Sequence, residues 1–74
     1  MAHIEFDYSE LEGKIKAVFK TQDAMAEAMG MSRSALNQRL NNVVNWKTKE
    51  LITACGLLKI PLNEAHIFFL TQKQ

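Results

Sequence analysis

The sequence predicts a compact all-α domain of five helices. Apolar residues recur at helical intervals, and no segment shows the sustained alternation of a half-buried strand. Short polar or glycine-containing stops separate these segments. With 74 residues the chain has room for one hydrophobic core, so residues 1–74 are expected to form a single domain. Its one cysteine cannot form an internal disulfide, and hydrophobic packing must therefore stabilise the fold.

The first helix is expected to open at Asp7, because Glu10 follows it at the spacing of a capping box. Its apolar face comprises Tyr8, Leu11, Ile15, Val18 and Phe19. Gly13 should weaken this helix by up to ~1 kcal/mol relative to alanine, so the helix needs tertiary support.

Two short helices follow, separated by a tight turn. Thr21 is a good N-cap for a helix over 22–29, and Gly30 suits the left-handed conformation that ends helices. Ser32 then caps a third helix, over about 33–41. Asparagines 41 and 42 provide its stop, since asparagine tolerates positive φ.

The remaining segments predict two more helices. Val43 to Trp46 should fold back on the core; packing of Trp46 there is favoured over stacking on a base. Thr48 caps a fourth helix that ends near Leu58 and turns Leu51, Ile52, Cys55 and Leu58 inward. Pro61 breaks the chain before a last helix, which the proline itself or Asn63 opens.

Charge is distributed unevenly although its total is only +1. Residues 1–29 carry a net −3 and residues 50–74 balance to zero. Residues 30–49 contain Arg33, Arg39, Lys47 and Lys49 but no acid, a net of +4. A basic middle third is expected where one face of a protein meets a polyanion, although chance clustering is the alternative.

The third helix has an unusual outward face. At about 100° per residue, five polar side chains fall within roughly 140°, namely Arg33, Ser34, Asn37, Gln38 and Asn41. Leu36, Leu40 and Val43 lie opposite. Arginine matches the acceptors of guanine and the amides match adenine, so Arg33, Ser34, Asn37 and Gln38 are candidates for reading bases. The alternative is a merely polar solvent face.

The segment Thr21–Asn42 resembles the helix-turn-helix of lambdoid phage repressors and Cro proteins, at Gln22, Ala26, Gly30, Ser32, Leu36 and Asn41. The likeness extends over about residues 8–70. The stretches FDYS, RLNN, WKTKE and the late FF are similar to small Cro-like regulators from phages of Gram-positive bacteria. The resemblance implies a five-helix lambda-repressor-like domain with a recognition helix near 33–41.

The resemblance also implies contacts to the DNA backbone. Relatives anchor a phosphate where this chain has Gln22, and they place an asparagine against the backbone at the position of Asn41. The full set of backbone candidates is Thr21, Gln22, Ser32, Asn41, Asn42, Lys47 and Lys49. Two departures stand out. Leu40 follows Leu36 by four residues where many relatives space them by three, and Lys59 occupies a position where relatives often have a helix-ending glycine.

Catalytic and metal chemistry find no support in the sequence. His3 and His66 have no cysteine or carboxylate at ligand spacing, so neither a metal nor another cofactor is expected. Cys55 falls on an inward helix face and is expected to be a buried, inert thiol. We therefore expect no enzyme and no small-molecule substrate. Without a secretory signal or an apolar run long enough to span a bilayer, the chain is expected in the cytoplasm of a bacterial host.

Four consecutive apolar residues near the end, 67–70, sweep about 300° of a helix. At least one, Phe68 or Phe69, is expected to face out as a partner surface for a homodimer or a heterodimer with a related repressor. In the alternative, all four close the core of a monomer.

The main functional hypothesis is a Cro-like transcriptional repressor that occupies double-stranded operator DNA. Two alternatives remain: a modulator or antirepressor that pairs with a related repressor, and the DNA-binding domain of an antitoxin.

Overall fold

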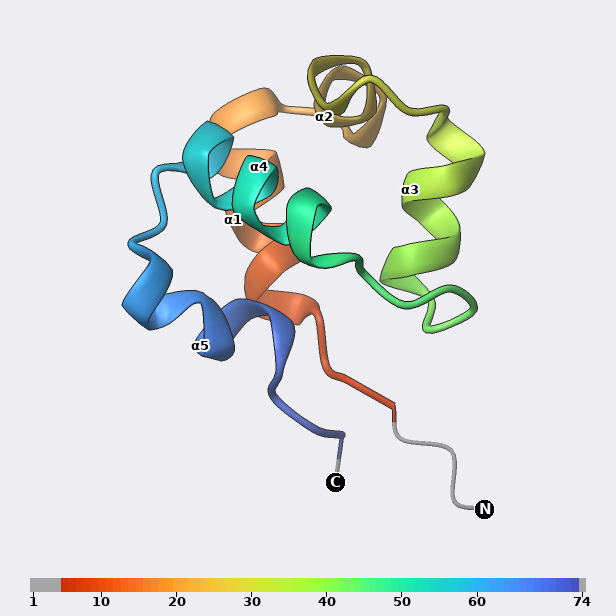
Figure 1. Ribbon diagram of the computed structural model, residues 1–74. Coiled ribbons are helices and arrows are strands. Elements are labelled where there is room, and N and C mark those ends of the chain that lie inside the picture. Colours follow the sequence, from red (N-terminus) through yellow and green to blue (C-terminus); the bar gives the residue numbers. More distant parts are fainter. Residues whose placement is uncertain (1–4, 74) are drawn as a thin grey trace.

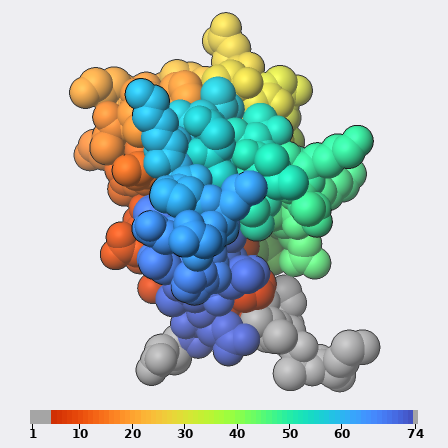
Figure 2. Space-filling model, turned by 60° about the vertical axis from the view of Figure 1, so that its left-hand side comes forward, coloured from red at the N-terminus to blue at the C-terminus, as the bar shows by residue number. Residues whose placement is uncertain are grey.

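The computed structural model describes residues 5–73, and its α-helices confirm the all-α fold (Figure 1). The helices are α1 (Ser9–Phe19), α2 (Gln22–Met29), α3 (Arg33–Leu40), α4 (Thr48–Leu58) and α5 (Ala65–Phe69), with a 3₁₀ turn, η1 (Leu62–Glu64), before the last. Helices α1 and α4 lie at the centre, α2 packs against both of them, α3 packs mainly against α2, and α5 packs against α1 and α4. In Figure 2 the C-terminal segment lies at the front, beside α1 and α4.

The helices meet around one core. Its buried apolar members are Tyr8, Leu11, Ile15, Met25, Ala26, Leu36, Leu40, Ala54, Cys55, Leu58, Ile60, Ala65 and Phe69. Trp46 packs against them, and its ring meets that of Phe69 edge to face with centroids 5.1 Å apart. The core position expected for Trp46 is confirmed, as is burial of the Cys55 thiol.

Local capping explains the bounds of α2 and α3. The hydroxyl of Thr21 accepts from the Ala24 N–H at 3.1 Å, and that of Ser32 accepts from the Ala35 N–H at 3.0 Å. Gly30 closes α2 at φ 72°. The bounds predicted for α2 are thus confirmed, and α3 ends one residue earlier than expected.

Two helix starts differ from the prediction. The Asp7 carboxylate accepts from the backbone and hydroxyl of Ser9, but no capping box forms, because the Asp7 N–H donates to the Thr71 carbonyl at 2.7 Å. Thr48 is the first residue of α4 rather than its cap. There the Glu50 carboxylate accepts from the Lys47 N–H at 3.0 Å and closes the helix start.

Three residues expected inside lie outside, and the first, Val18 of α1, is 44% exposed. Val43 is 70% exposed because α3 has already ended, and Asn42 turns the chain with φ 62°. Ile52 is 49% exposed, since the buried stripe of α4 is centred on Ala54, Cys55 and Leu58.

The chain ends are joined beside the end of α3. Phe6 and Gln72 form an antiparallel bridge, and the Lys73 N–H donates to the Glu5 carbonyl at 2.9 Å. The Asn42 side chain accepts from the Phe6 N–H at 2.8 Å and donates to the Phe6 carbonyl at 3.0 Å. A segment at the start of the chain is therefore fixed to the end of α3.

A buried ion pair fixes α3 against α4. The Arg39 guanidinium donates to both Glu50 carboxylate oxygens at 2.8 Å and to the Ala35 carbonyl at 2.8 Å. The two side chains are only 11% and 19% exposed. Hydrogen bonds from Arg39 lower the pKa of the Glu50 carboxyl below its ordinary value of 4.5.

We predict that Glu50→Gln lowers the free energy of unfolding by about 2 kcal/mol at neutral pH, because it leaves the Arg39 charge without its partner. The folded-state pKa is depressed, so the wild-type advantage should be complete above about pH 4.5 and disappear as the pH falls through the lowered value. Urea unfolding across this pH range measures both effects. Glu27→Gln, at an exposed site, is the control; equal losses in both variants would contradict the prediction.

A second prediction concerns Lys59, which ends α4 in the left-handed region at φ 57°. Glycine adopts this conformation without the steric cost that an L side chain bears, so Lys59→Gly should raise the free energy of unfolding by about 0.5–1 kcal/mol. Ala28→Gly, on the exposed side of α2, should lower it by about 1 kcal/mol. Loss of stability in both variants would show that the strain at Lys59 is negligible.

Candidate recognition surface on α3

Helices α2 and α3 form a helix-turn-helix. The turn at Gly30 and Met31 is short, and the Met31 N–H donates to the Ala26 carbonyl at 3.0 Å. Ala26 on α2 is buried and Ala35 on α3 is partly buried, as expected where two backbones approach closely. The geometry presents one side of α3 to solvent, on the right in Figure 1.

The exposed side of α3 carries the side chains that the sequence selected. Arg33, Ser34, Asn37 and Gln38 are all exposed, whereas Leu36 is completely buried. The orientation inferred from the spacing therefore agrees with the structure. These four residues present one guanidinium, one hydroxyl and two amides, which suit base edges and the polar groups of a protein partner equally well.

Arg33 is held by a carboxylate of the neighbouring helix. Its guanidinium lies 3.0 Å from the Asp23 carboxylate, and both side chains are more than half exposed. Such a pair contributes about 0–1 kcal/mol to stability. Its larger consequence is electrostatic, because it places a negative charge beside the only cation on the exposed face of α3. The linear sequence gave no signal of this contact between residues ten positions apart.

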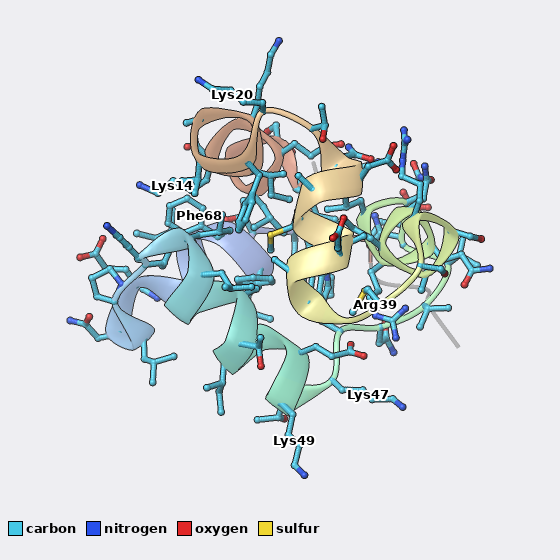
Figure 3. All side chains as sticks on the ribbon, turned by 90° about the horizontal axis from the view of Figure 1, so that it is seen from above. Lys14, Lys20, Arg39, Lys47, Lys49 and Phe68 are labelled. Carbon is cyan, nitrogen blue, oxygen red and sulfur yellow. The ribbon has the colours of Figure 1, made fainter. Side chains whose placement is uncertain are left out.

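The basic surface expected from residues 30–49 is smaller than predicted. Arg39 is buried in the pair with Glu50, and Arg33 is paired with Asp23. Lys47 and Lys49 remain, projecting from the start of α4 well apart from Lys20 at the opposite end of the view (Figure 3). The charge count was right, but half of these cations have a carboxylate partner.

The candidates for DNA-backbone contact occupy varied settings. The Thr21 and Ser32 hydroxyls cap helices, and Gln22 is half-buried at the start of α2. The Asn41 side chain donates back to the Asn37 carbonyl and contacts the Asn37 amide. Asn42 has both polar groups committed to Phe6, a structural role that the sequence analysis missed.

Of the two aromatic residues predicted to form a partner surface on the last helix, Phe69 faces inward, and the surface itself stays a prediction. Phe69 is 2% exposed, because its ring fills the core beside Trp46. Phe68 is half-buried and lines a surface hollow between α1 and α5, whereas Ile67 and Leu70 are the exposed apolar residues there. Helix α5 begins at Ala65, and its two buried residues, Ala65 and Phe69, are four positions apart and so lie on the same side of the helix.

The other residues considered from sequence form no chemical centre within residues 5–73. Cys55 is only 1% exposed, and this burial raises the pKa of its thiol. His66 is exposed. His3 lies outside the described residues. In the described part of the chain no three metal-ligating side chains gather, and no helix is long and apolar enough to cross a membrane.

Comparison with known proteins shows that this fold resembles that of a phage regulator. The chain is similar to the solution structure of the modulator of repression (MOR) of the temperate bacteriophage TP901-1 from Lactococcus lactis. It is 36% identical, covers 86% of each chain and superposes with a TM-score of 0.78. No curated protein matches the chain.

The similarity to a phage regulator supports the resemblance drawn from sequence at that coarser level, and the relative's name describes a regulatory protein rather than an enzyme. Residues 4–72 match a family described as a protein of unknown function, DUF739. That match spans nearly the whole length, so this chain belongs to the DUF739 family.

Proposed function

We propose that this protein modulates a phage repressor by binding to the repressor itself. The observation that carries the proposal is its 36% identity, over 86% of both chains, to a modulator of repression. The sequence analysis held this mode of action as its alternative, and the relative favours it over occupancy of an operator.

The charges around α3 support a protein partner. Within residues 21–42 the exposed ionic side chains are Asp23, Glu27 and Arg33, because Arg39 is buried with Glu50. DNA affinity depends largely on cations that neutralise phosphates. A helix-turn-helix without an excess of exposed cations is poorly suited to DNA, whereas its polar groups remain available for hydrogen bonds to a protein.

The second candidate is a Cro-like regulator that binds operator DNA. The acid-free exposed face of α3 favours it, with Arg33, Ser34, Asn37 and Gln38 reading bases. Lys47 and Lys49 would then contact phosphates from the start of α4.

The first test titrates this protein into the repressor encoded by the same phage, with a repressor from an unrelated phage as control. We expect a complex of fixed stoichiometry with the cognate repressor alone, observed by calorimetry and gel filtration. Binding of this protein to the repressor and binding of the repressor to its operator are thermodynamically linked. Formation of the complex should therefore also alter the affinity of the repressor for its operator. An unaltered operator titration and no heat of binding would contradict the proposal.

The second test separates the two candidates on DNA. If the protein reads an operator, Arg33→Ala should cost about 1–3 kcal/mol of binding and relax preference at one base pair. Under the proposed function, operator binding by this protein alone is weak and insensitive to Arg33→Ala. Asp23→Asn, which frees Arg33, is the matched variant with the opposite electrostatic effect. Strong, Arg33-dependent operator binding would overturn the proposed function in favour of the second candidate.

A further inference from the structure

The outer face of α1 carries a charge pattern that inverts about its centre. The segment reads Glu-Leu-Glu-Gly-Lys-Ile-Lys over residues 10–16, with Gly13 in the middle. Leu11 and Ile15 are buried in the core, and Gly13 lies on the opposite side of the helix, between Ser9 and Ala17. The four charged side chains flank this outer strip, Glu10 and Lys14 on one side and Glu12 and Lys16 on the other.

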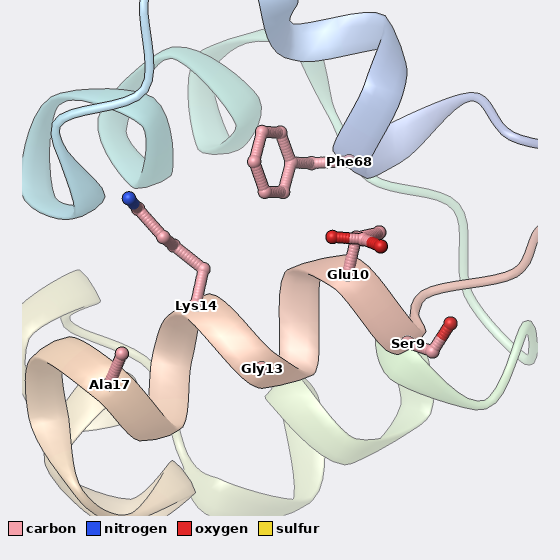
Figure 4. Close-up of a pocket in the computed structure, with 6 residues that line it drawn as sticks. All are labelled: Ser9, Glu10, Gly13, Lys14, Ala17 and Phe68. Atoms are coloured by element: carbon pink, nitrogen blue, oxygen red, sulfur yellow. The ribbon is translucent and has the colours of Figure 1, made fainter.

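These charges are not paired within the part of the chain that the structure describes. Glu10 with Lys14 and Glu12 with Lys16 have the spacing of intrahelical ion pairs, yet the described ion pairs join other residues. Figure 4 shows the Lys14 ammonium directed away from the Glu10 carboxylate, with the Phe68 ring above them. Both flanks therefore offer charges to an external partner.

The same face is hollowed. A depression of about 400 Å³ is lined by Ser9, Glu10, Gly13, Lys14, Ala17 and Phe68. Phe68 forms one wall, and the small side chains along α1 form the floor (Figure 4). The position of a Cβ on Gly13 would meet no atom within 4 Å, so this glycine is not required by packing inside the chain.

We propose that this face of α1 binds α1 of a second copy of the chain, antiparallel, with the two helices crossing near Gly13. A two-fold axis perpendicular to the helices keeps each flank on its own side and reverses the direction along the axis. With a rise of about 1.5 Å per residue, Glu10 of one copy then lies within about 3 Å along the axis of Lys14 of the other. Glu12 and Lys16 meet in the same way on the second flank. Near the crossing the two Lys14 side chains on one flank, and the two Glu12 side chains on the other, come equally close, so each flank has two attractive contacts for one repulsive contact.

The charge order selects both the occupant and its direction. A symmetric parallel arrangement would have one attractive contact on each flank against a glutamate pair and a lysine pair, so it is less favourable. An unrelated helix would have to match four charges, whereas a second copy does so by symmetry. Gly13 supplies close approach at the crossing, and the partner helix covers the exposed edge of Phe68.

The pairing is weak and leaves the α3 surface open. Two helices in contact over nine residues bury well under the roughly 1,200 Å² of a stable complex, so the dimer dissociates readily. In Figure 3, Lys14 and Phe68 lie on the far side of the molecule from α3. The proposal is independent of the proposed function, since a repressor bound through α3 would not occupy this face.

A charge-swap experiment tests the pairing by analytical ultracentrifugation over a wide concentration range. The variant E10K/E12K has four lysines on α1, and the variant K14E/K16E has four glutamates. Each alone should self-associate at least about tenfold more weakly than wild type. Their equimolar mixture should associate at least as tightly as wild type, because every contact between the two variants is attractive. A wild-type monomer at all concentrations, or a mixture no better than its components, would overturn the proposal.

Gly13→Gln provides the steric test, with Gly13→Ala as its smaller control. Glutamine favours the helix over glycine, so the variant should fold at least as well, as judged by urea unfolding. It should nevertheless weaken self-association by about tenfold or more, because two side chains then collide at the crossing. Binding to the cognate repressor should be unchanged. If Gly13→Gln abolishes repressor binding, the face belongs to the repressor and the dimer proposal fails, while the proposed function stands.

Discussion

The contact between Arg39 and Glu50 is the constraint on which the recognition surface depends. It joins α3 to α4, and the same carboxylate also caps α4 through the Lys47 N–H. Arg39 further donates to the Ala35 carbonyl within α3. One acid therefore fixes where α4 begins and how α3 is rotated against it. Burial of a charged pair stabilises a fold only when the hydrogen bonds of both charged groups are satisfied. The hydrogen bonds of Arg39 to Glu50 and Ala35, and that of the Lys47 N–H to Glu50, meet this condition.

This arrangement changes how the charge of the protein is interpreted. Cations counted along a sequence are an upper bound on the charge that a ligand meets, because carboxylates brought close by folding neutralise some of them. Arg33 and Arg39 both acquire such partners here, one at the surface and one in the interior. A helix-turn-helix can thus keep the backbone geometry of a DNA reader while losing much of its attraction for phosphate.

Local signals predicted the fold well, and long-range contacts account for most errors. Thr21, Gly30 and Ser32 act through neighbours three or four residues away, so the bounds of α2 and the start of α3 were predictable. The start of α1 was not, because the Asp7 N–H is taken by Thr71. The exposure of the α3 side chains followed from helical spacing. Their ion pairs did not, since Asp23 and Glu50 come from adjacent helices. Phe69 was misplaced because its orientation depends on where a five-residue helix begins.

The burial of Cys55 has a practical consequence. This residue is the only cysteine of the chain, it lies in the core between α4 and its neighbours, and the pKa of its thiol is raised by burial. An alkylating reagent reaches such a sulfur only when the surrounding helices separate. The rate at which the native protein is alkylated would therefore report the opening free energy of its core. This single-site chemical measurement needs no added label and leaves the α1 and α3 surfaces unmodified.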